Sequence, residues 1–117
     1  MNPSKQKGTA AETAVVDYLR ANGWPHAERR TLAGAHDRGD IAGIPGVVVE
    51  VKACRTFDLA GWVAEAHTEA ENAGMPLGVV WAKRRGKSSP DEWYVVMTGR
   101  DLVVLLKAVA RSWEVGG

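Results

Sequence analysis

The sequence predicts an α/β fold of the α+β kind, with a central mixed β-sheet of about five strands flanked by helices. Two observations lead to this prediction. Three segments carry apolar side chains at helical spacing, and short β-branched runs lie between them, in the order α-β-β-β-α-β-β-α. The 117 residues are enough to bury one core and too few for two, so residues 1–117 are expected to form a single domain.

The first half of the chain is expected to hold one helix and three short strands, at residues 9–22, 24–33, 40–44 and 47–53. Gly23 is a suitable stop for the helix. Pro25 weakens the first strand and suits the edge of a sheet or the start of a strand. The last two strands are β-branched runs around Pro45-Gly46, which predicts a hairpin.

The second half is expected to hold a helix, two strands and a last helix, at residues 58–73, 77–83, 92–98 and 102–113. The first of these helices has an apolar stripe that includes Leu59 and Trp62. The nearly continuous apolar run 77–83 is typical of a strand buried on both faces. Thr98 and Asp101 form a loose capping box before the last helix. The side chains of that helix expected to face inward are Leu102, Leu105, Leu106 and Val109.

The composition, 45% hydrophobic and 25% charged, is that of an ordinary globular protein. No apolar stretch approaches the roughly 20 residues needed to cross a bilayer. The N-terminus lacks the apolar core of a secretory signal, and the one cysteine, Cys54, cannot form an internal disulfide. We therefore expect a cytoplasmic protein without membrane contact. The net charge of +1 hides separate basic and acidic clusters, which leaves a nucleic-acid partner open.

The hairpin contains charged residues where a buried strand is expected. Neighbouring residues of a strand point to opposite faces, so Glu50 and Lys52 share one face with Val48. A two-residue loop of type I or II is disfavoured in hairpins, whereas a three-residue loop at Ile44–Gly46 pairs Asp40 with Glu50. Their Cβ atoms would then lie about 4.5–5.5 Å apart. The simpler interpretation is a solvated ion pair of Glu50 and Lys52 on an exposed face.

Two opposed carboxylates repel each other and raise each other's pKa, unless a divalent cation lies between them. Oxygen ligands suit Mg²⁺ or Mn²⁺. Lys52 beside such a site could orient or help deprotonate a water molecule, or stabilise charge that develops on a phosphate. Glu12 lies at helical spacing from Val16 and Leu19, which turns it toward the sheet.

These residues resemble the motif of the PD-(D/E)XK nuclease superfamily: Asp40 in "GDI", Glu50 and Lys52 in "VEVKA", and Glu12 in "KGTAAE" on a preceding helix. The opening helix is similar to that of Holliday-junction-resolvase-like members. The resemblance implies a restriction-endonuclease-like core in which Asp40, Glu50 and the backbone carbonyl of Val51 bind the metal. It also implies that Lys52 assists hydrolysis and that Glu12 completes the acidic site.

The chain departs from the family pattern at two places. Gly39 stands where the motif has proline, and the helix after the lysine strand offers Glu65 or Glu69 where some members carry glutamine. Which of the two glutamates joins the site is left open.

The resemblance implies a Mg²⁺-dependent DNA endonuclease, selective for branched DNA such as a Holliday junction and acting in recombination or repair as a homodimer. Mn²⁺ would be able to replace Mg²⁺. One alternative is another PD-(D/E)XK nuclease, of the repair, replication or restriction type. The other is a catalytically silent DNA-binding module of the same fold. The residues expected to contact DNA are Lys7, Arg30, Arg38, Lys83, Arg84, Arg85 and Lys87.

Overall fold

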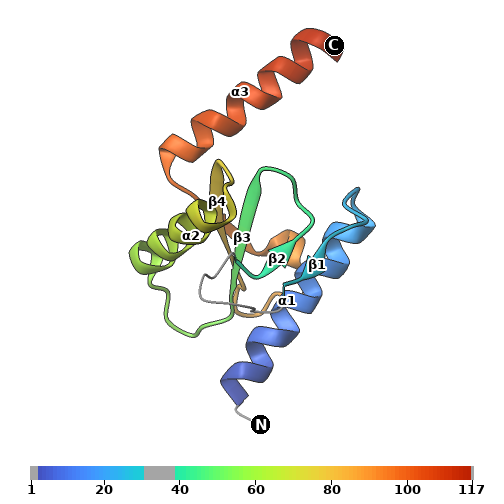
Figure 1. Ribbon diagram of the computed structural model, residues 1–117. Coiled ribbons are helices and arrows are strands. Elements are labelled where there is room, and N and C mark those ends of the chain that lie inside the picture. The colour runs from blue at the N-terminus through green and yellow to red at the C-terminus, as the bar shows by residue number, and fades with distance from the viewer. Residues whose placement is uncertain (1–2, 31–38, 117) are drawn as a thin grey trace.

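The structure is a computed structural model that describes residues 3–30 and 39–116, with the side chains of residues 6–30 and 39–114. It is an α+β fold built on a mixed five-stranded sheet in the order β1-β2-β3-β4-β5 (Figure 1). Its α-helices and strands are α1 (Pro3–Ala21), β1 (Glu28–Arg29), β2 (Ile41–Ala42), β3 (Val47–Lys52), α2 (Leu59–Ala73), β4 (Leu77–Ala82), β5 (Tyr94–Val96) and α3 (Gly99–Gly116). A short 3₁₀ turn, Pro90–Glu92, precedes β5. The predicted fold class and order of elements are confirmed.

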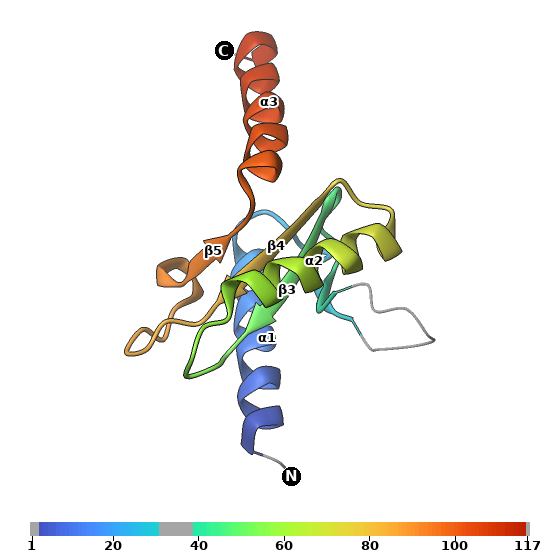
Figure 2. The ribbon, with the colours of Figure 1, turned by 90° about the vertical axis from the view of Figure 1, so that its left-hand side faces the viewer.

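Helices α1 and α2 lie on opposite faces of the sheet, as Figure 2 shows with α2 in front and α1 behind. The buried side of α1 includes Val15 and Leu19, which pack with Val49 and Val51 of β3. After α1 the backbone N–H of Trp24 donates to the Leu19 carbonyl at 3.0 Å. One face of β3 is therefore apolar and closed by α1, as the alternation of the strand predicts.

Helix α2 covers the other face and begins and ends as its sequence predicts. The Asp58 side chain caps the first turn by accepting a hydrogen bond from the Gly61 N–H, and Gly74 ends the helix in the left-handed conformation, with φ +67°. Trp62 and Ala66 pack on β4. Leu59, expected in the apolar stripe, is instead exposed. Leu59 is the first residue of α2, and its side chain lies outside the part of the helix that packs on the sheet.

The sheet combines an antiparallel hairpin with a parallel pair. In the hairpin Ile41 pairs with Val49, so the three-residue loop and its register are confirmed. Strand β4 runs parallel to β3 and antiparallel to β5, and it is buried along most of its length. Because β3 and β4 are parallel, their carboxyl ends lie side by side at the same end of the sheet.

The first strand is much shorter than the predicted segment 24–33. Only Glu28 and Arg29 pair with β2, and residues 31–33 lie outside the described part of the chain. Before them the Ala27 N–H donates to the Trp24 carbonyl, and Arg20 Nε donates to the Ala27 carbonyl at 2.7 Å. A turn bound to α1 therefore occupies residues for which we expected a strand.

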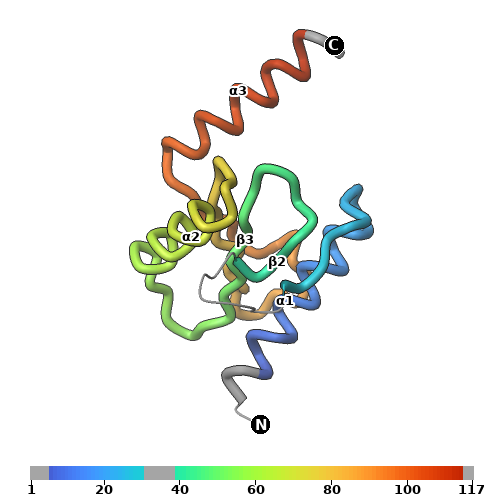
Figure 3. The backbone as a smooth tube through the Cα atoms, in the orientation of Figure 1, coloured from blue at the N-terminus to red at the C-terminus, as the bar shows by residue number. Residues whose placement is uncertain are grey.

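Helix α3 projects away from the sheet, as the path of the chain in Figure 3 shows. Thr98 caps it as predicted, since its Oγ1 accepts a hydrogen bond from the Asp101 N–H at 3.2 Å. The Asp101 carboxylate points into the body of the protein, where it accepts from the Gly78 N–H and lies 3.2 Å from Nε2 of His67. Only the start of the helix is thereby fixed to β4 and α2.

The prediction that the apolar residues of α3 face inward is wrong. Leu102, Leu105, Leu106 and Val109 are all exposed, Leu106 to 53%, and Trp113 is exposed to 74%. Helical spacing shows that a helix has an apolar face but does not say which element covers it. Within the described residues, no helix is both long and apolar enough to cross a membrane.

Candidate active site

Asp40 lies immediately before β2 and is held by the backbone of β3. Its own N–H donates to the Val49 carbonyl at 3.1 Å, and its Oδ2 accepts a hydrogen bond from the Val51 N–H at 2.7 Å. Ile41 is the residue of β2 that pairs with Val49, and the Asp40 carboxyl lies close enough to Glu50 for the charge of Glu50 to raise its pKa. The Val51 N–H therefore bonds to the Asp40 carboxylate where a β-ladder would offer a backbone carbonyl, and this hydrogen bond fixes the direction of the Asp40 side chain.

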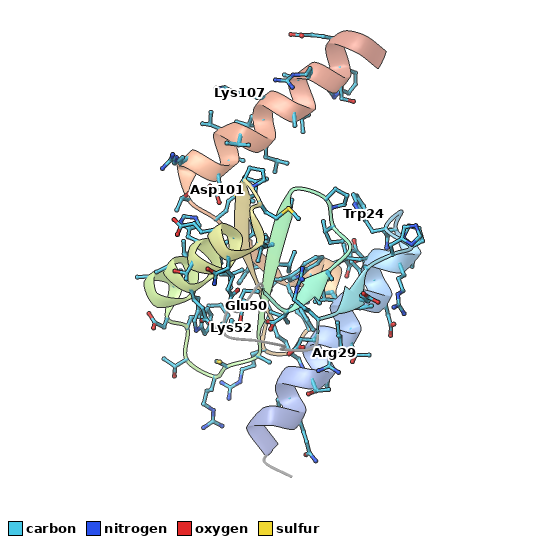
Figure 4. The ribbon with its side chains drawn as sticks, viewed as in Figure 1. Trp24, Arg29, Glu50, Lys52, Asp101 and Lys107 are labelled. Atoms are coloured by element: carbon cyan, nitrogen blue, oxygen red, sulfur yellow. The ribbon has the colours of Figure 1, made fainter. Side chains whose placement is uncertain are left out.

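Glu50 is the buried centre of the site, with an exposed fraction of 5%. Its Oε1 lies 3.3 Å from the Lys52 Nζ, and Figure 4 shows the two side chains together between the sheet and α2. The other oxygen, Oε2, is buried, and no N–H group of the described residues donates to it, so its available partners are neighbouring carboxyls that carry a proton, such as Glu69. A buried carboxylate oxygen without a donor is costly unless it is protonated or binds a cation.

Two glutamates of α2 complete the group. Glu65 and Glu69 are one helical turn apart, and each places a carboxylate oxygen within 4.8 Å of one of Glu50 and of each other. Glu69 is only 2% exposed, whereas Glu65 lies at the surface. The sequence left open which of them joins the site, and in the structure both do.

Burial and mutual repulsion raise the pKa values of the two central acids. Loss of hydration and the charge of Glu50 raise the pKa of Asp40 to about 8. Loss of hydration and the neighbouring carboxyl of Glu69 raise the pKa of Glu50 to about 9, although Lys52 acts in the opposite direction. Near neutral pH the site therefore favours bound protons or a bound cation over free carboxylates.

Lys52 is held as a cation by two carboxylates. Burial alone would lower its pKa, but the hydrogen bond to Glu65, at 2.9 Å, and the charge of Glu50 outweigh burial and raise the pKa. The ammonium group therefore stays charged across the physiological range. It can donate hydrogen bonds and stabilise negative charge, but it is a poor proton acceptor in this arrangement.

Glu12 lies on α1, which covers the face of the sheet opposite to Glu50. Its Oε1 forms an ion pair with Nε of Arg29, at 3.2 Å. Glu12 adds to the raised pKa of Asp40 through its charge, and it does not belong to the carboxylate group that Glu50 forms with α2. Glu12 is therefore close enough to Asp40 to raise its pKa through charge, but its own ion pair is with Arg29.

The backbone carbonyl of Val51 lies on the side of β3 that faces Asp40. The Lys52 carbonyl accepts from the Lys83 N–H, so Lys52 bonds toward β4, and the residue before it, Val51, bonds toward β2. The N–H and C=O of one strand residue point to the same side, and the Val51 N–H donates to Asp40. The three predicted metal ligands, Asp40, Glu50 and Val51, are therefore neighbours.

Gly39 is required at the position where the family motif has proline. Its φ of +93° is inaccessible to proline, and a Cβ atom there would lie 2.5 Å from Cγ1 of Val48. The departure from the motif therefore follows from the backbone that delivers Asp40 to the site.

Four of the seven basic residues expected to contact DNA lie together in the structure. Lys7, Lys83, Arg84 and Arg85 line one hollow beside the ends of β3 and β4. Lys87 lies in the same loop and is paired with Glu92 at 4.0 Å. Arg30 is half-buried, and its buried Nε has no hydrogen-bond partner among the described residues. Arg38 lies outside the described residues.

Comparisons with known proteins give no match, whether with protein-family models, curated proteins or solved structures. The functional argument therefore rests on the chemistry of this site.

Proposed function

We propose that the protein is a Mg²⁺-dependent DNA endonuclease of the PD-(D/E)XK type. One observation carries the proposal: Asp40, Glu50 and Lys52 meet at the end of two strands, where the pKa values of both acids are raised. A purely structural hairpin gains nothing from burying two carboxylates that repel each other. Such an arrangement is typical of a site that binds a divalent cation or handles protons.

The donors present fit Mg²⁺, with Mn²⁺ as a substitute, because all of them are oxygens. Asp40, Glu50 and the Val51 carbonyl would form one set of ligands, and Glu50, Glu65 and Glu69 a second set. Glu50 belongs to both, and its buried Oε2 accepts no hydrogen bond from an N–H group of the described residues that a metal would have to displace. When bound, the metal would neutralise these carboxylates and polarise a phosphate oxygen.

The remaining steps belong to residues of the chain. The hydrogen bond from the Val51 N–H holds Asp40 in one rotamer, so its carboxylate is already oriented before a substrate binds. The charged Lys52 donates to the developing negative charge of a phosphodiester under attack. Glu12 acts at a distance, by holding Arg29 and by adding negative charge near Asp40.

We further propose that the protein acts on branched DNA as a homodimer, and that α3 forms the dimer interface. The exposed residues Leu102, Leu106, Val109 and Trp113 follow one another at steps of four, three and four, which is the spacing of a two-helix seam. A second copy of α3 supplies the matching helix. Paired active sites suit symmetric cleavage of a Holliday junction, which one site alone cannot achieve.

One observation favours a silent DNA-binding module as the second candidate. Lys52 is already bound to Glu50 and Glu65, and Glu65 would have to release it before the lysine could reach a substrate. In a protein that only binds DNA, this ion-paired cluster would be a permanent structural feature.

The test is cleavage of a labelled four-way DNA junction and of the matched linear duplex, in Mg²⁺ and in EDTA. We expect metal-dependent cleavage of the junction, lost in Glu50→Gln and retained in Glu71→Gln, an exposed glutamate on the same helix as Glu65. Equal cleavage of both DNAs would favour another nuclease of the superfamily. Binding without cleavage, for the unaltered protein in Mg²⁺ and Mn²⁺, would favour the silent module.

A further inference from the structure

A basic hollow of about 300 Å³ lies at the carboxyl ends of β3 and β4, next to the candidate active site. Its described lining is Lys7, Ala53, Cys54, Arg55, Phe57, Lys83, Arg84, Arg85 and Gly86, with five cations and no acid. The end of a parallel strand pair is where ligands commonly bind in α/β sheets. The lining predicts an anionic ligand.

The hollow is tied to the active-site strand by its backbone. Ala53 to Arg55 follow Lys52 directly, and the Lys83 N–H donates to the Lys52 carbonyl at 2.8 Å. A ligand in the hollow is therefore held within a few residues of Lys52.

Two of the cations are supported by aromatic rings. The guanidinium of Arg84 lies 4.6 Å from the ring centre of Tyr94 and donates to the Glu92 carbonyl at 2.9 Å. The Lys83 Nζ lies 5.8 Å from the ring centre of Trp93. These contacts preorganise the positive charge, which makes it a better anion site than freely moving side chains would be.

The volume of the hollow and the aromatic ring of Phe57 in its wall indicate which class of anionic ligand it can bind. A volume of about 300 Å³ is at the lower limit of small-molecule sites, so it admits one nucleotide and excludes a base-paired duplex, whose bases stay stacked inside. Phe57 is partly exposed on the wall of the hollow and is supported from behind by Trp62, at 5.3 Å between ring centres. An exposed, supported ring beside cations is the arrangement on which unpaired bases stack.

We propose that this hollow binds one unstacked nucleotide of a DNA strand, with the phosphate on the cations and the base against Phe57. The proposal deepens the proposed function, on which it rests for DNA as the ligand. It assigns the substrate class: DNA with an unpaired or unstacked nucleotide at a branch point, next to the bond to be cut.

The test measures binding in EDTA, so that cleavage plays no part. Fluorescence anisotropy would compare a labelled oligothymidine, a duplex with an oligothymidine overhang and the blunt duplex. We expect the first two to bind at least about fivefold more tightly than the blunt duplex, in line with one stacked base. Phe57→Leu should remove this preference and Phe57→Tyr should keep it.

The cations are tested with Arg55→Gln and Arg85→Gln, which should each weaken binding of the overhang DNA severalfold, and with Lys107→Gln as the control. Lys107 is an exposed cation on α3, far from Glu50 and Lys52 in Figure 4. Circular dichroism melts would confirm that each variant is folded.

Equal affinity for all three DNAs, or an equal loss for all three in Phe57→Leu, would overturn the proposal. The outcomes also separate it from the proposed function. A preference for unpaired DNA in EDTA, without any cleavage in Mg²⁺, would retain this site and reject the nuclease. Cleavage without that preference would do the reverse.

Discussion

The Asp40 carboxylate accepts a hydrogen bond from the backbone N–H of Val51, and this contact fixes the geometry of the candidate site. It closes the hairpin at the point where the backbone ladder of β2 ends, with 2.7 Å between Oδ2 and N. It also holds an acid of raised pKa close to Glu50, whose charge contributes to that raised pKa. Strand pairing and the acidic site thus depend on the same side chain.

Stability without divalent cations should fall as the pH rises. The folded pKa values of Asp40 and Glu50, about 8 and about 9, lie above their ordinary values of 3.8 and 4.5. The native state therefore binds more protons than the unfolded state between about pH 4 and pH 9, and stability decreases across this window. We expect a loss of about 1–3 kcal/mol between pH 5 and pH 9, measured by urea unfolding in EDTA.

Mg²⁺ or Mn²⁺ should reverse this loss. A cation binds the ionised carboxylates of the native state, so it should raise the Tm at pH 8–9 more than at pH 5. The same Tm gain at both pH values, or none at all, would contradict a cation site built on Asp40 and Glu50.

Asp40→Asn should stabilise the cation-free protein at pH 8 while abolishing cleavage. The amide oxygen of asparagine can still accept from the Val51 N–H, and the repulsion with Glu50 is removed. We expect a gain of about 1–2 kcal/mol in the free energy of unfolding in EDTA. A clear loss of stability in EDTA would instead mean that the charged Asp40 has a structural role.

Glu65→Gln tests whether the ion pair between Glu65 and Lys52 controls cleavage. Glu65 is exposed and binds Lys52 at 2.9 Å, so the substitution removes the negative charge of one of the two partners of the lysine. If Lys52 acts on the substrate, junction cleavage should change by about threefold or more in either direction. Binding of DNA in EDTA should change little. Glu71→Gln, on the exposed side of α2, is the matched control.

Much of the site could be predicted from alternation along one strand. The spacing of Glu50 and Lys52 placed them on one face, and the preference for a three-residue loop paired Asp40 with Glu50. Both follow from local geometry. The register of Ile41 with Val49 confirms the three-residue loop, and the effect of Glu50 on the pKa of Asp40 shows that the two carboxyls are close.

Glu69 could also have been found, because it follows Trp62 by seven residues and Ala66 by three. That places it on the buried stripe of α2, where an acid is unexpected. The sequence does not show how far the helix turns above β3, so it could not decide between Glu65 and Glu69. The exposure of α3 could not be predicted either, because an apolar stripe on a helix does not show which other element will cover it.

The apolar seam of α3 makes the last prediction, which concerns the oligomeric state. Leu102, Leu106, Val109 and Trp113 lie on one side of a helix that projects from the body, so pairing with a second α3 would remove them from water. Leu106→Glu should place a charge inside that pair and convert the dimer to a monomer, measured by sedimentation velocity.

Arg111→Glu is the matched control for this substitution. Arg111 follows Leu102 by nine residues, which at 100° per residue places it on the opposite side of the helix. It should leave the dimer intact, although it also introduces a glutamate. If the unaltered protein is a monomer at micromolar concentration, or if both variants dissociate equally, the α3 seam is not the interface. Symmetric junction cleavage would then need a different one.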